Sequence, residues 1–276
     1  RRADQLALLL VGAPMINCCC LSTNDRNEVP VVKDVTASEK EAYAGSRKGH
    51  TFGNGSTYTG EWSGSDRHGY GLQVWPDGAR YEGQWVNDMA DGDGRFLHSD
   101  GDIYHGQWRR DQAHGKGTYT HSTGSKYYGQ WVEDKQDGEG EEEWPDGSKY
   151  TGQYKDGRKN GTGHFFWMDG SSYVGAFFEN NIHGEGVYTW GDRRSYCGQW
   201  MDNRMHGRGS FSWPDGRSYE GEYDKDHKHG SGSFKWPDGR QYAGQWQFGK
   251  QHGEGTISNA QGESKSGTWE DGKRLS

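Results

Sequence analysis

The tryptophans of this 276-residue chain constrain its fold more than any other feature. All 13 lie between Trp62 and Trp269, and they occupy only two positions of a 23-residue period. The first position holds Trp62, Trp85, Trp108, Trp131, Trp200, Trp246 and Trp269. The second holds Trp75, Trp144, Trp167, Trp190, Trp213 and Trp236. A fixed period of this length is typical of a repeat array, in which each unit packs against its neighbours.

Tyrosine and glycine keep the same period without an insertion. Tyrosine recurs at Tyr58, Tyr81, Tyr104, Tyr127, Tyr150, Tyr173, Tyr196, Tyr219 and Tyr242. Glycine follows two residues after each of them. From Tyr58 to Trp62 the large rings alternate with polar residues, and alternation of period two predicts a strand with one buried face. The run from Leu72 to Trp75 alternates in the same way, so each period contains two strands.

Turn signals separate the two strands of each period. Trp75-Pro76-Asp77-Gly78 and its later copies place proline and glycine where a turn requires a preset φ and a positive φ. We expect the His68-Gly69-x-Gly71 segment to form the bend of the hairpin, with its glycines needed for positive φ or close backbone approach. Gly60 lies between two rings of one strand face, which leaves bare backbone on which an aromatic ring can lie.

These patterns predict an all-β fold, an elongated single-layer antiparallel sheet of about ten 23-residue β-hairpins. Each hairpin advances the sheet by roughly 9.6 Å, so the array should be about 90 Å long. We place the array at residues 49–272, with a half repeat first, nine full repeats from Tyr58, and a degenerate repeat last. Residues 1–48 are predicted to be a disordered tail, and residues 273–276 a C-terminal tail.

The composition agrees with a thin aromatic core rather than a globular one. Hydrophobic residues make up 29% of the chain, yet aromatic residues alone make up 14%. The formal net charge is −8. Since binding to nucleic acid or to anionic lipid needs a basic surface, the charge argues against both as partners of the array.

The combined motif, Tyr-x-Gly-x-Trp followed by His-Gly-x-Gly and Asp-Gly, resembles the MORN repeat. The resemblance covers residues 49–272 and departs from the pattern at few positions. The first tryptophan is replaced at Tyr154, Phe177 and Tyr223, the histidine at Asp91, Asp137 and Asn160, and the tyrosine at Lys265. A degenerate last unit is expected of a terminal repeat.

The resemblance implies a non-enzymatic scaffold or adaptor that binds a partner protein, as in junctophilins, radial-spoke heads of cilia and cytoskeletal collars. It implies a cytoplasmic protein associated with the cytoskeleton, a cilium or a membrane. MORN repeats also precede the kinase domain of plant phosphatidylinositol phosphate kinases. A lipid-sensing or regulatory module associated with such a kinase is therefore the alternative.

Catalytic, cofactor and metal sites are not predicted. The carboxylates at the Asp77 position recur in most repeats as turn residues, whereas catalysis needs one distinctive site. Six histidines share the His68 position, but equivalent atoms of adjacent repeats lie roughly 9.6 Å apart, too far for one metal ion. Phosphate-loop and nucleophile-elbow motifs are missing from the sequence.

The aromatic face is the predicted working surface. A long exposed aromatic stripe typically marks an interaction site, and an amphipathic helix laid in an apolar groove is the expected partner. A homodimer is an alternative that the sequence leaves open. The residues assigned to partner binding are Tyr104, Trp108, Tyr127, Trp131, Tyr150, Trp167, Tyr173, Trp190, Tyr196, Trp200 and Tyr219.

Three adjacent cysteines near the N-terminus are a candidate lipidation site. If translation begins at Met15, then Cys18, Cys19 and Cys20 are candidates for S-acylation, which would anchor the protein to a membrane. The alternative is three free thiols in a tail. Residues 1–14 contain a short apolar run and either precede the true start or form a targeting signal.

Overall fold

The computed structural model describes residues 48–276, and every regular element in them is a β-strand. The strands, in chain order, are β1 (Lys48–Thr51), β2 (Thr57–Ser63), β3 (Asp66–Val74), β4 (Arg80–Val86), β5 (Met89–Leu97), β6 (Ile103–Arg109), β7 (Gln112–Thr120), β8 (Lys126–Val132), β9 (Lys135–Glu143), β10 (Lys149–Lys155), β11 (Arg158–Phe166), β12 (Ser172–Phe178), β13 (Asn181–Thr189), β14 (Ser195–Met201), β15 (Arg204–Ser212), β16 (Ser218–Asp224), β17 (His227–Lys235), β18 (Gln241–Gln247), β19 (Lys250–Ser258), β20 (Ser264–Glu270) and β21 (Lys273–Arg274).

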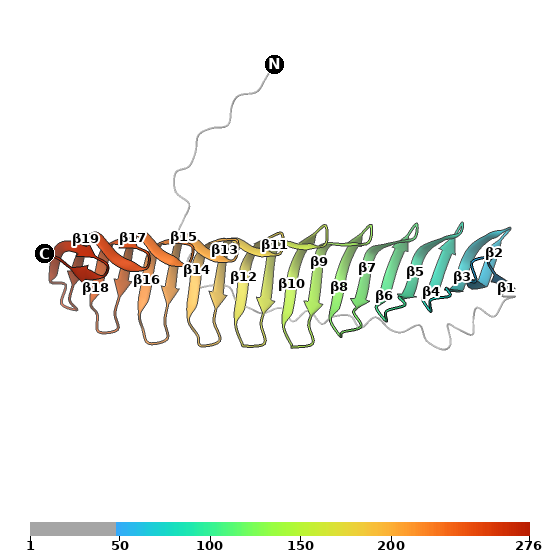
Figure 1. Cartoon of the computed structure of the whole chain (residues 1–276), viewed down its shortest axis with the longest axis horizontal. Coiled ribbons are helices and arrows are strands. Elements are labelled where there is room, and N and C mark those ends of the chain that lie inside the picture. The colour runs from blue at the N-terminus through green and yellow to red at the C-terminus, as the bar shows by residue number, and fades with distance from the viewer. Residues whose placement is uncertain (1–47) are drawn as a thin grey trace, which may run out of the picture.

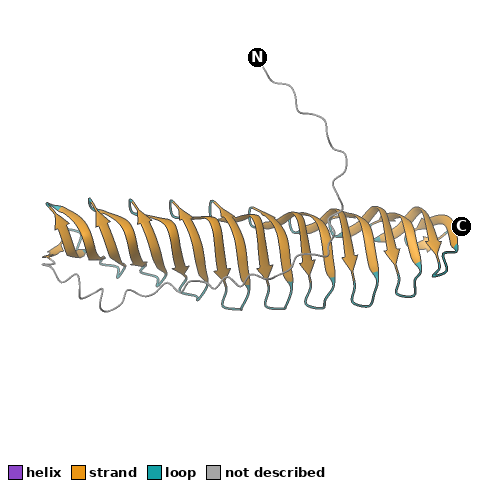
Figure 2. Ribbon diagram, turned by 180° about the vertical axis from the view of Figure 1, so that it is seen from behind, coloured by secondary structure: helices purple, strands orange, loops and turns teal. Residues whose placement is uncertain are grey.

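Each strand pairs antiparallel with the next strand along the chain, so the sheet contains no crossover. The result is one open sheet of 21 strands. Figures 1 and 2 show the strands following one another along a long axis, in a single layer. This confirms the predicted fold class. The part of the chain that the structure describes contains no helix that could span a membrane.

Two kinds of turn connect the strands, one kind along each long side of the sheet. β4 and β5 are joined by Asn87 and Asp88 with φ of 50° and 67°, which is the type I′ turn that matches the twist of paired strands. β3 and β4 are joined through Trp75–Ala79, where the Gly78 N–H donates to the Trp75 carbonyl at 3.0 Å. In that turn the Asp77 carboxylate accepts the N–H of Ala79 at 3.1 Å. The recurrent aspartates are therefore turn residues, as predicted.

The type I′ turns also connect each repeat to the one before it. Asp88 accepts the N–H of Arg67 on its side chain at 2.8 Å and donates its own N–H to the Arg67 carbonyl at 3.0 Å. The same pair of bonds recurs at Asp111, Asp134, Asn180, Asn203 and Asp226. Asp and Asn suit this position because they tolerate positive φ and provide a short acceptor.

The His-Gly-x-Gly segment lies inside a strand and not at the hairpin bend, so that prediction was wrong. His68 to Gly71 belong to β3, where Trp62 pairs with Arg67 and Gly60 pairs with Gly71. One residue of β2 therefore faces three residues of β3, which makes a β-bulge that bends the strand. Gly69 has the positive φ, 75°, that this bulge requires. The bend recurs in every full repeat and hollows one face of the sheet into a groove.

The ends of the array differ from the predicted boundaries. Residues 273–276 are not a tail, because β21 pairs with β20 and Leu275 donates its N–H to the Thr268 carbonyl at 2.8 Å. This last pair covers Trp269, which is only 4% exposed. At the other end β1 begins at Lys48. Cys18, Cys19 and Cys20 lie outside the described residues.

Candidate functional site: an aromatic groove

The floor of the groove is a row of tyrosines, one from each full repeat. All nine, from Tyr58 to Tyr242, are at most 3% exposed. Each hydroxyl donates to the carbonyl three residues later, as Tyr196 does to Gln199 at 2.9 Å. The ring lies on two paired glycines of neighbouring strands, which for Tyr196 are Gly198 and Gly209. The predicted stacking of a ring on bare backbone is confirmed, and the ring comes from the same strand.

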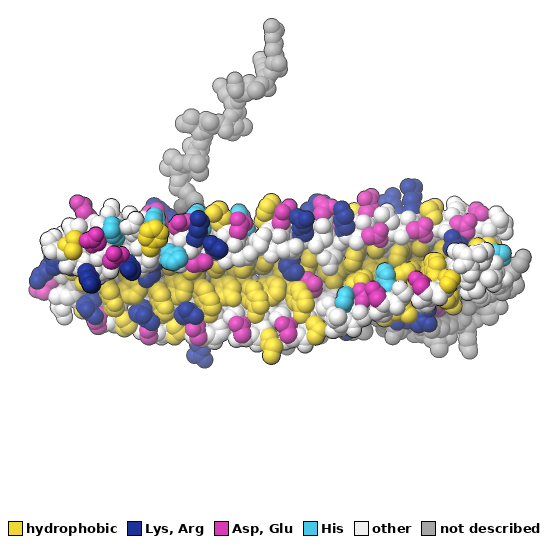
Figure 3. Space-filling view, viewed as in Figure 1, with side chains coloured by type: hydrophobic (Ala, Val, Ile, Leu, Met, Phe, Trp, Pro, Cys, Tyr) yellow, Lys and Arg dark blue, Asp and Glu magenta, His cyan; other side chains and the backbone are white. Residues whose placement is uncertain are grey.

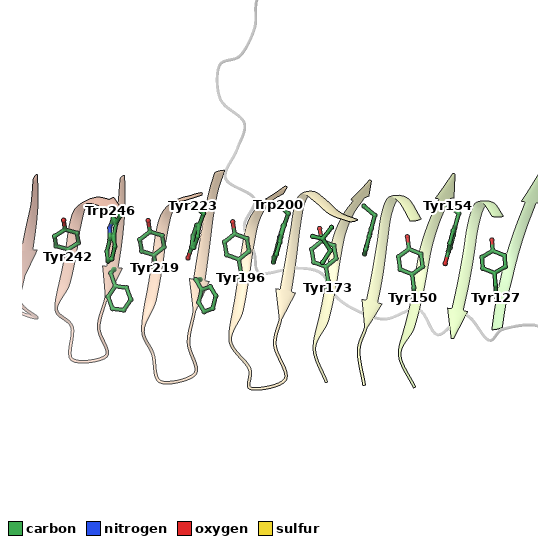
Figure 4. Packing of buried hydrophobic residues seen from close by; sticks show 14 of the residues in the cluster. Tyr127, Tyr150, Tyr154, Tyr173, Tyr196, Trp200, Tyr219, Tyr223, Tyr242 and Trp246 are labelled. Carbon is green, nitrogen blue, oxygen red and sulfur yellow. The ribbon is translucent and has the colours of Figure 1, made fainter. Parts of the chain in front are cut away.

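The first-position tryptophans separate these tyrosines and connect successive repeats. Figure 4 shows Trp200 standing edge-on beside Tyr196 in the row. Its ring centroid lies 5.1 Å from that of Tyr196 and 5.8 Å from that of Tyr173 in the repeat before. The indole N–H donates to a glycine carbonyl of the preceding repeat, at 3.1 Å between Trp131 and Gly117. Each tryptophan therefore stabilises two repeats at once.

Trp131→Ala is therefore expected to destabilise the array by about 3–5 kcal/mol, and to do so locally. Hydrogen exchange should accelerate in residues 104–149 while residues 219–264 keep their protection. Trp131→Tyr is the matched control, because tyrosine occupies the same position at Tyr154 and Tyr223. Equal acceleration along the whole array would contradict nearest-neighbour packing.

Most residues predicted to contact a partner belong to this buried floor. Of the 11 named, eight are buried: Tyr104, Tyr127, Trp131, Tyr150, Tyr173, Tyr196, Trp200 and Tyr219. Side chains with so little exposure shape the groove and offer almost no surface for direct contact. Partner binding by this set of residues stays a prediction. Trp108, Trp167 and Trp190 are partly exposed.

The surface above the floor is a second row of aromatic side chains, which we call the aromatic ladder. It consists of Trp144, Phe165, Trp167, Tyr188, Trp190, Phe211, Trp213, Phe234 and Trp236. Consecutive ring centroids lie between 4.3 and 5.7 Å apart. All of its members except Phe211 and Phe234 are partly exposed. Figure 3 shows apolar side chains gathered in a stripe along the long axis, between two rims that carry charged groups.

One position in the groove changes from repeat to repeat while the backbone around it stays the same. We call it the floor position, and it is a different position from that of the floor tyrosines. Its residue pairs across the hairpin with the tryptophan, tyrosine or phenylalanine at the first tryptophan position. Along the chain it holds Arg67, Ala90, Ala113, Gln136, Lys159, Ile182, Met205, Lys228 and Gln251. At Ala90 the short side chain helps open a cavity of about 460 Å³, lined also by Trp75, Trp85, Phe96 and Trp108. The groove therefore differs in depth and charge along its length.

Paired charges line one rim of the groove. Arg194, Arg217 and Arg240 each contact the turn aspartate two residues before them, Nε to Oδ2, at 2.7–2.8 Å. Each guanidinium also lies over the ladder tryptophan of its own turn, 5.3–5.5 Å from the ring centroid. Because an opposite charge lies beside each arginine, the rim attracts anions weakly. Within residues 48–276 no cluster of three or more His, Cys, Asp or Glu side chains could hold a metal ion.

Glutamines between the tyrosine and the first-position tryptophan of several repeats have a structural role. Gln199 lies opposite the bulge, and its Oε1 accepts the N–H of Arg208 at 3.0 Å. The same bond joins Gln84 to Asp93 and Gln130 to Glu139, both at 2.8 Å. The side chain fills the space that a Cβ at the bulge glycine would need. These glutamines therefore hold the bend, a role that the alternation of rings and polar residues does not reveal.

Sequence reasoning missed two lysines of the groove, Lys159 and Lys228. Each occupies the floor position, where neighbouring repeats carry Ile182 and Met205. In both repeats the first-position tryptophan is also replaced by tyrosine. These two joint departures from the repeat pattern are a signal that could have identified the lysines.

The chain is an open single layer of 23-residue β-hairpins with an aromatic groove on one face. This architecture places it in the class of β-hairpin repeat scaffolds. The MORN-repeat family model matches nine consecutive segments: residues 58–80, 81–103, 104–126, 127–149, 150–172, 173–193, 196–216, 219–239 and 242–264. The chain belongs to the MORN-repeat family, a family of non-enzymatic repeat scaffolds. No curated protein matches the chain.

Several solved structures are distantly similar. The TCP10 domain of Danio rerio CPAP, in complex with a peptide of Danio rerio STIL, is 14% identical with a TM-score of 0.40, covering 81% of this chain and 100% of that chain. The SAS-4 TCP domain of Drosophila melanogaster, in complex with a proline-rich motif of Ana2, is 15% identical with a TM-score of 0.35, covering 64% and 90%. Virginiamycin B lyase from Staphylococcus aureus is 13% identical with a TM-score of 0.15, covering 83% and 71%.

Proposed function

We propose that this MORN-repeat protein is a non-enzymatic scaffold whose groove holds an amphipathic helix of a partner protein. The observation that carries the proposal is the aromatic ladder, a continuous and partly exposed run of rings over five repeats. Exposed apolar patches of this extent typically mark interaction sites. Aromatic side chains also contribute most strongly to protein interfaces.

The spacing of the ladder supports a helical partner. Successive repeats present equivalent rings roughly 9.6 Å apart, two strand spacings. An α-helix presents every seventh residue on one face about 10.5 Å apart. A helix lying along the array can therefore place one apolar residue of each heptad against each repeat over a few repeats, while its polar face stays in water.

The test is a pair of single substitutions at aromatic residues on opposite faces. Peptides are first selected on the full chain from a displayed random library, and their affinities are then measured by fluorescence anisotropy. Trp190→Ser in the ladder should weaken binding by about tenfold or more. Phe178→Ser, at a side chain 52% exposed on the opposite face, should leave it unchanged. Both variants must keep the circular dichroism of the parent.

Two outcomes would overturn the proposal. The first is that no peptide is retained by the full chain. The second is that Phe178→Ser abolishes binding while Trp190→Ser leaves it intact. Association with a phosphoinositide kinase, a cytoskeletal or ciliary location, a homodimer, and membrane anchoring through Cys18, Cys19 and Cys20 stay predictions.

A further inference from the structure

Two repeats carry the same tyrosine–lysine pair in the groove, three repeats apart. Tyr154 pairs with Lys159 across β10 and β11, and Tyr223 pairs with Lys228 across β16 and β17. In both pairs the two side chains lie on the aromatic face. Because the backbone repeats, the first pair shows directly what the second pair can bind.

The first pair holds a carboxylate from its own chain. The Tyr154 hydroxyl donates to Oε2 of Glu142 at 2.9 Å, and the Lys159 ammonium lies 2.7 Å from the same oxygen. Lys159 also lies over the rings of Trp144 and Tyr150, 4.9 and 5.0 Å from their centroids. A half-buried cation is thus neutralised by a carboxylate within an aromatic wall.

The second pair has no such carboxylate, because Phe211 occupies the position equivalent to Glu142. The Tyr223 hydroxyl is buried without a hydrogen-bond partner. Lys228 forms no ion pair with any residue between 48 and 276. A buried donor without a partner and a cation without a counter-charge are both costly.

Aromatic rings surround the Lys228 ammonium. Its Nζ lies 4.5 Å from the ring centroid of Phe234, 4.8 Å from Trp246, 5.1 Å from Tyr219 and 5.4 Å from Trp213. Burial, together with the smaller effect of the nearby Arg217 charge, lowers the pKa of Lys228 to about 8. Cation–π contacts offset part of the lost hydration, yet the net effect of the site disfavours the charge.

We propose that Tyr223 and Lys228 bind the carboxylate of an aspartate or glutamate side chain supplied by the partner segment in the groove. This inference rests on the proposed function and specifies the chemistry of the partner. An acidic side chain is the expected source because Glu142 fills the equivalent site as a side chain. The carboxylate reaches the half-buried Lys228 first, and the buried Tyr223 hydroxyl is reached as the flexible lysine side chain moves.

Other repeats provide substitutions that the fold accepts. Met205 occupies the floor position one repeat before Lys228, so Lys228→Met removes the charge and keeps the packing. Phe177 occupies the position of Tyr223 two repeats earlier, so Tyr223→Phe removes only the hydroxyl. Lys159→Met is the matched control, because the same change there affects a site that is already filled.

The experiment titrates the full chain with phenylacetate, an aromatic carboxylate, and with benzyl alcohol as its neutral analogue, while NMR monitors the lysine side chains. We expect phenylacetate to shift the Lys228 signal saturably and benzyl alcohol to bind more weakly. Lys228→Met should weaken phenylacetate binding by about tenfold or abolish it, and Tyr223→Phe should weaken it by about threefold. Lys159→Met should leave it unchanged.

Thermal unfolding of the same variants provides a second readout without a ligand. Lys228→Met should raise Tm because it removes an unmatched cation, and Lys159→Met should lower Tm because it leaves Glu142 unpaired. The site is overturned if phenylacetate binds no better than benzyl alcohol, if Lys228→Met binds phenylacetate like the parent, or if both methionine variants lower Tm equally. If phenylacetate binds but no peptide is selected, the carboxylate site stands and the proposed groove function falls.

Discussion

Raising the pH above 10 is expected to unfold the array in one steep transition. The nine floor tyrosines are buried, and burial raises the pKa of each of them, to about 12 for Tyr58. In the unfolded chain a tyrosine ionises near its usual pKa of about 10. Their stabilising contribution is therefore fully present below pH 10 and is lost as the pH rises towards the folded pKa values.

The size of the effect follows from the number of tyrosines. Each tyrosine that ionises only in the unfolded chain lowers the free energy of unfolding by about 1.4 kcal/mol per pH unit. Nine together lower it by about 12 kcal/mol per unit, which is as large as the stability of many whole domains. Lys228 acts in the opposite direction, since its folded pKa of about 8 lies below its usual value and stability rises between the two. One lysine cannot offset nine tyrosines.

The measurement follows tyrosinate absorbance and far-ultraviolet circular dichroism in parallel. We expect both signals to change together in a single steep step above pH 10, and to recover when the pH is lowered. Tyrosines that titrate near pH 10 while the circular dichroism stays constant would show that the floor is accessible to solvent, and would contradict its burial.

The second large effect is expected from a single methyl group on a floor glycine. A Cβ on Gly209 would lie 2.3 Å from the Tyr196 hydroxyl and 2.4 Å from two ring carbons. Tyr196 is fully buried and hydrogen-bonded to Gln199, so the ring has no room to move. Gly209→Ala should therefore force the ring from the floor or separate the strands.

We expect Gly209→Ala to reduce the free energy of unfolding by about 3–5 kcal/mol, measured by urea denaturation. If no ring lay against Gly209, the same substitution would stabilise the folded protein by about 0.4–1 kcal/mol, because alanine reduces the conformational entropy of the unfolded chain. The sign of the effect thus tests the packing. Ser210→Ala, on the exposed side of the same strand, is the control and should have little effect. If the Gly209→Ala and Ser210→Ala variants had the same free energy of unfolding, the close contact between Gly209 and the Tyr196 ring would be refuted.

The predicted strands and turns were correct because they depend on local chemistry. Alternating rings and polar residues favour a strand with one buried face, and Pro-Asp-Gly favours a turn whatever lies around it. Gly209 is an example at the level of one residue: the repeat pattern required a glycine there, and the Tyr196 ring explains why. The wrong assignment concerned the His-Gly-x-Gly segment, because a bulge inside a strand and a bend between strands both require glycine.

The sequence by itself therefore determined the period, the hairpins and the face on which the rings lie. Only the tertiary structure decided which rings are reachable, because alternation assigns a side chain to a face and says nothing of its depth. Tyr196 and Trp190 share one face, yet Tyr196 is buried between the rings of Trp200 and Tyr223, and Trp190 remains partly exposed in the aromatic ladder. The missing counter-charge of Lys228 was likewise hidden, since it depends on which residue the preceding hairpin places at one position: Glu142 there contacts Lys159, whereas Phe211 holds the equivalent position in the repeat before Lys228. Such contacts arise between strands, and they form only when the bent repeats pack.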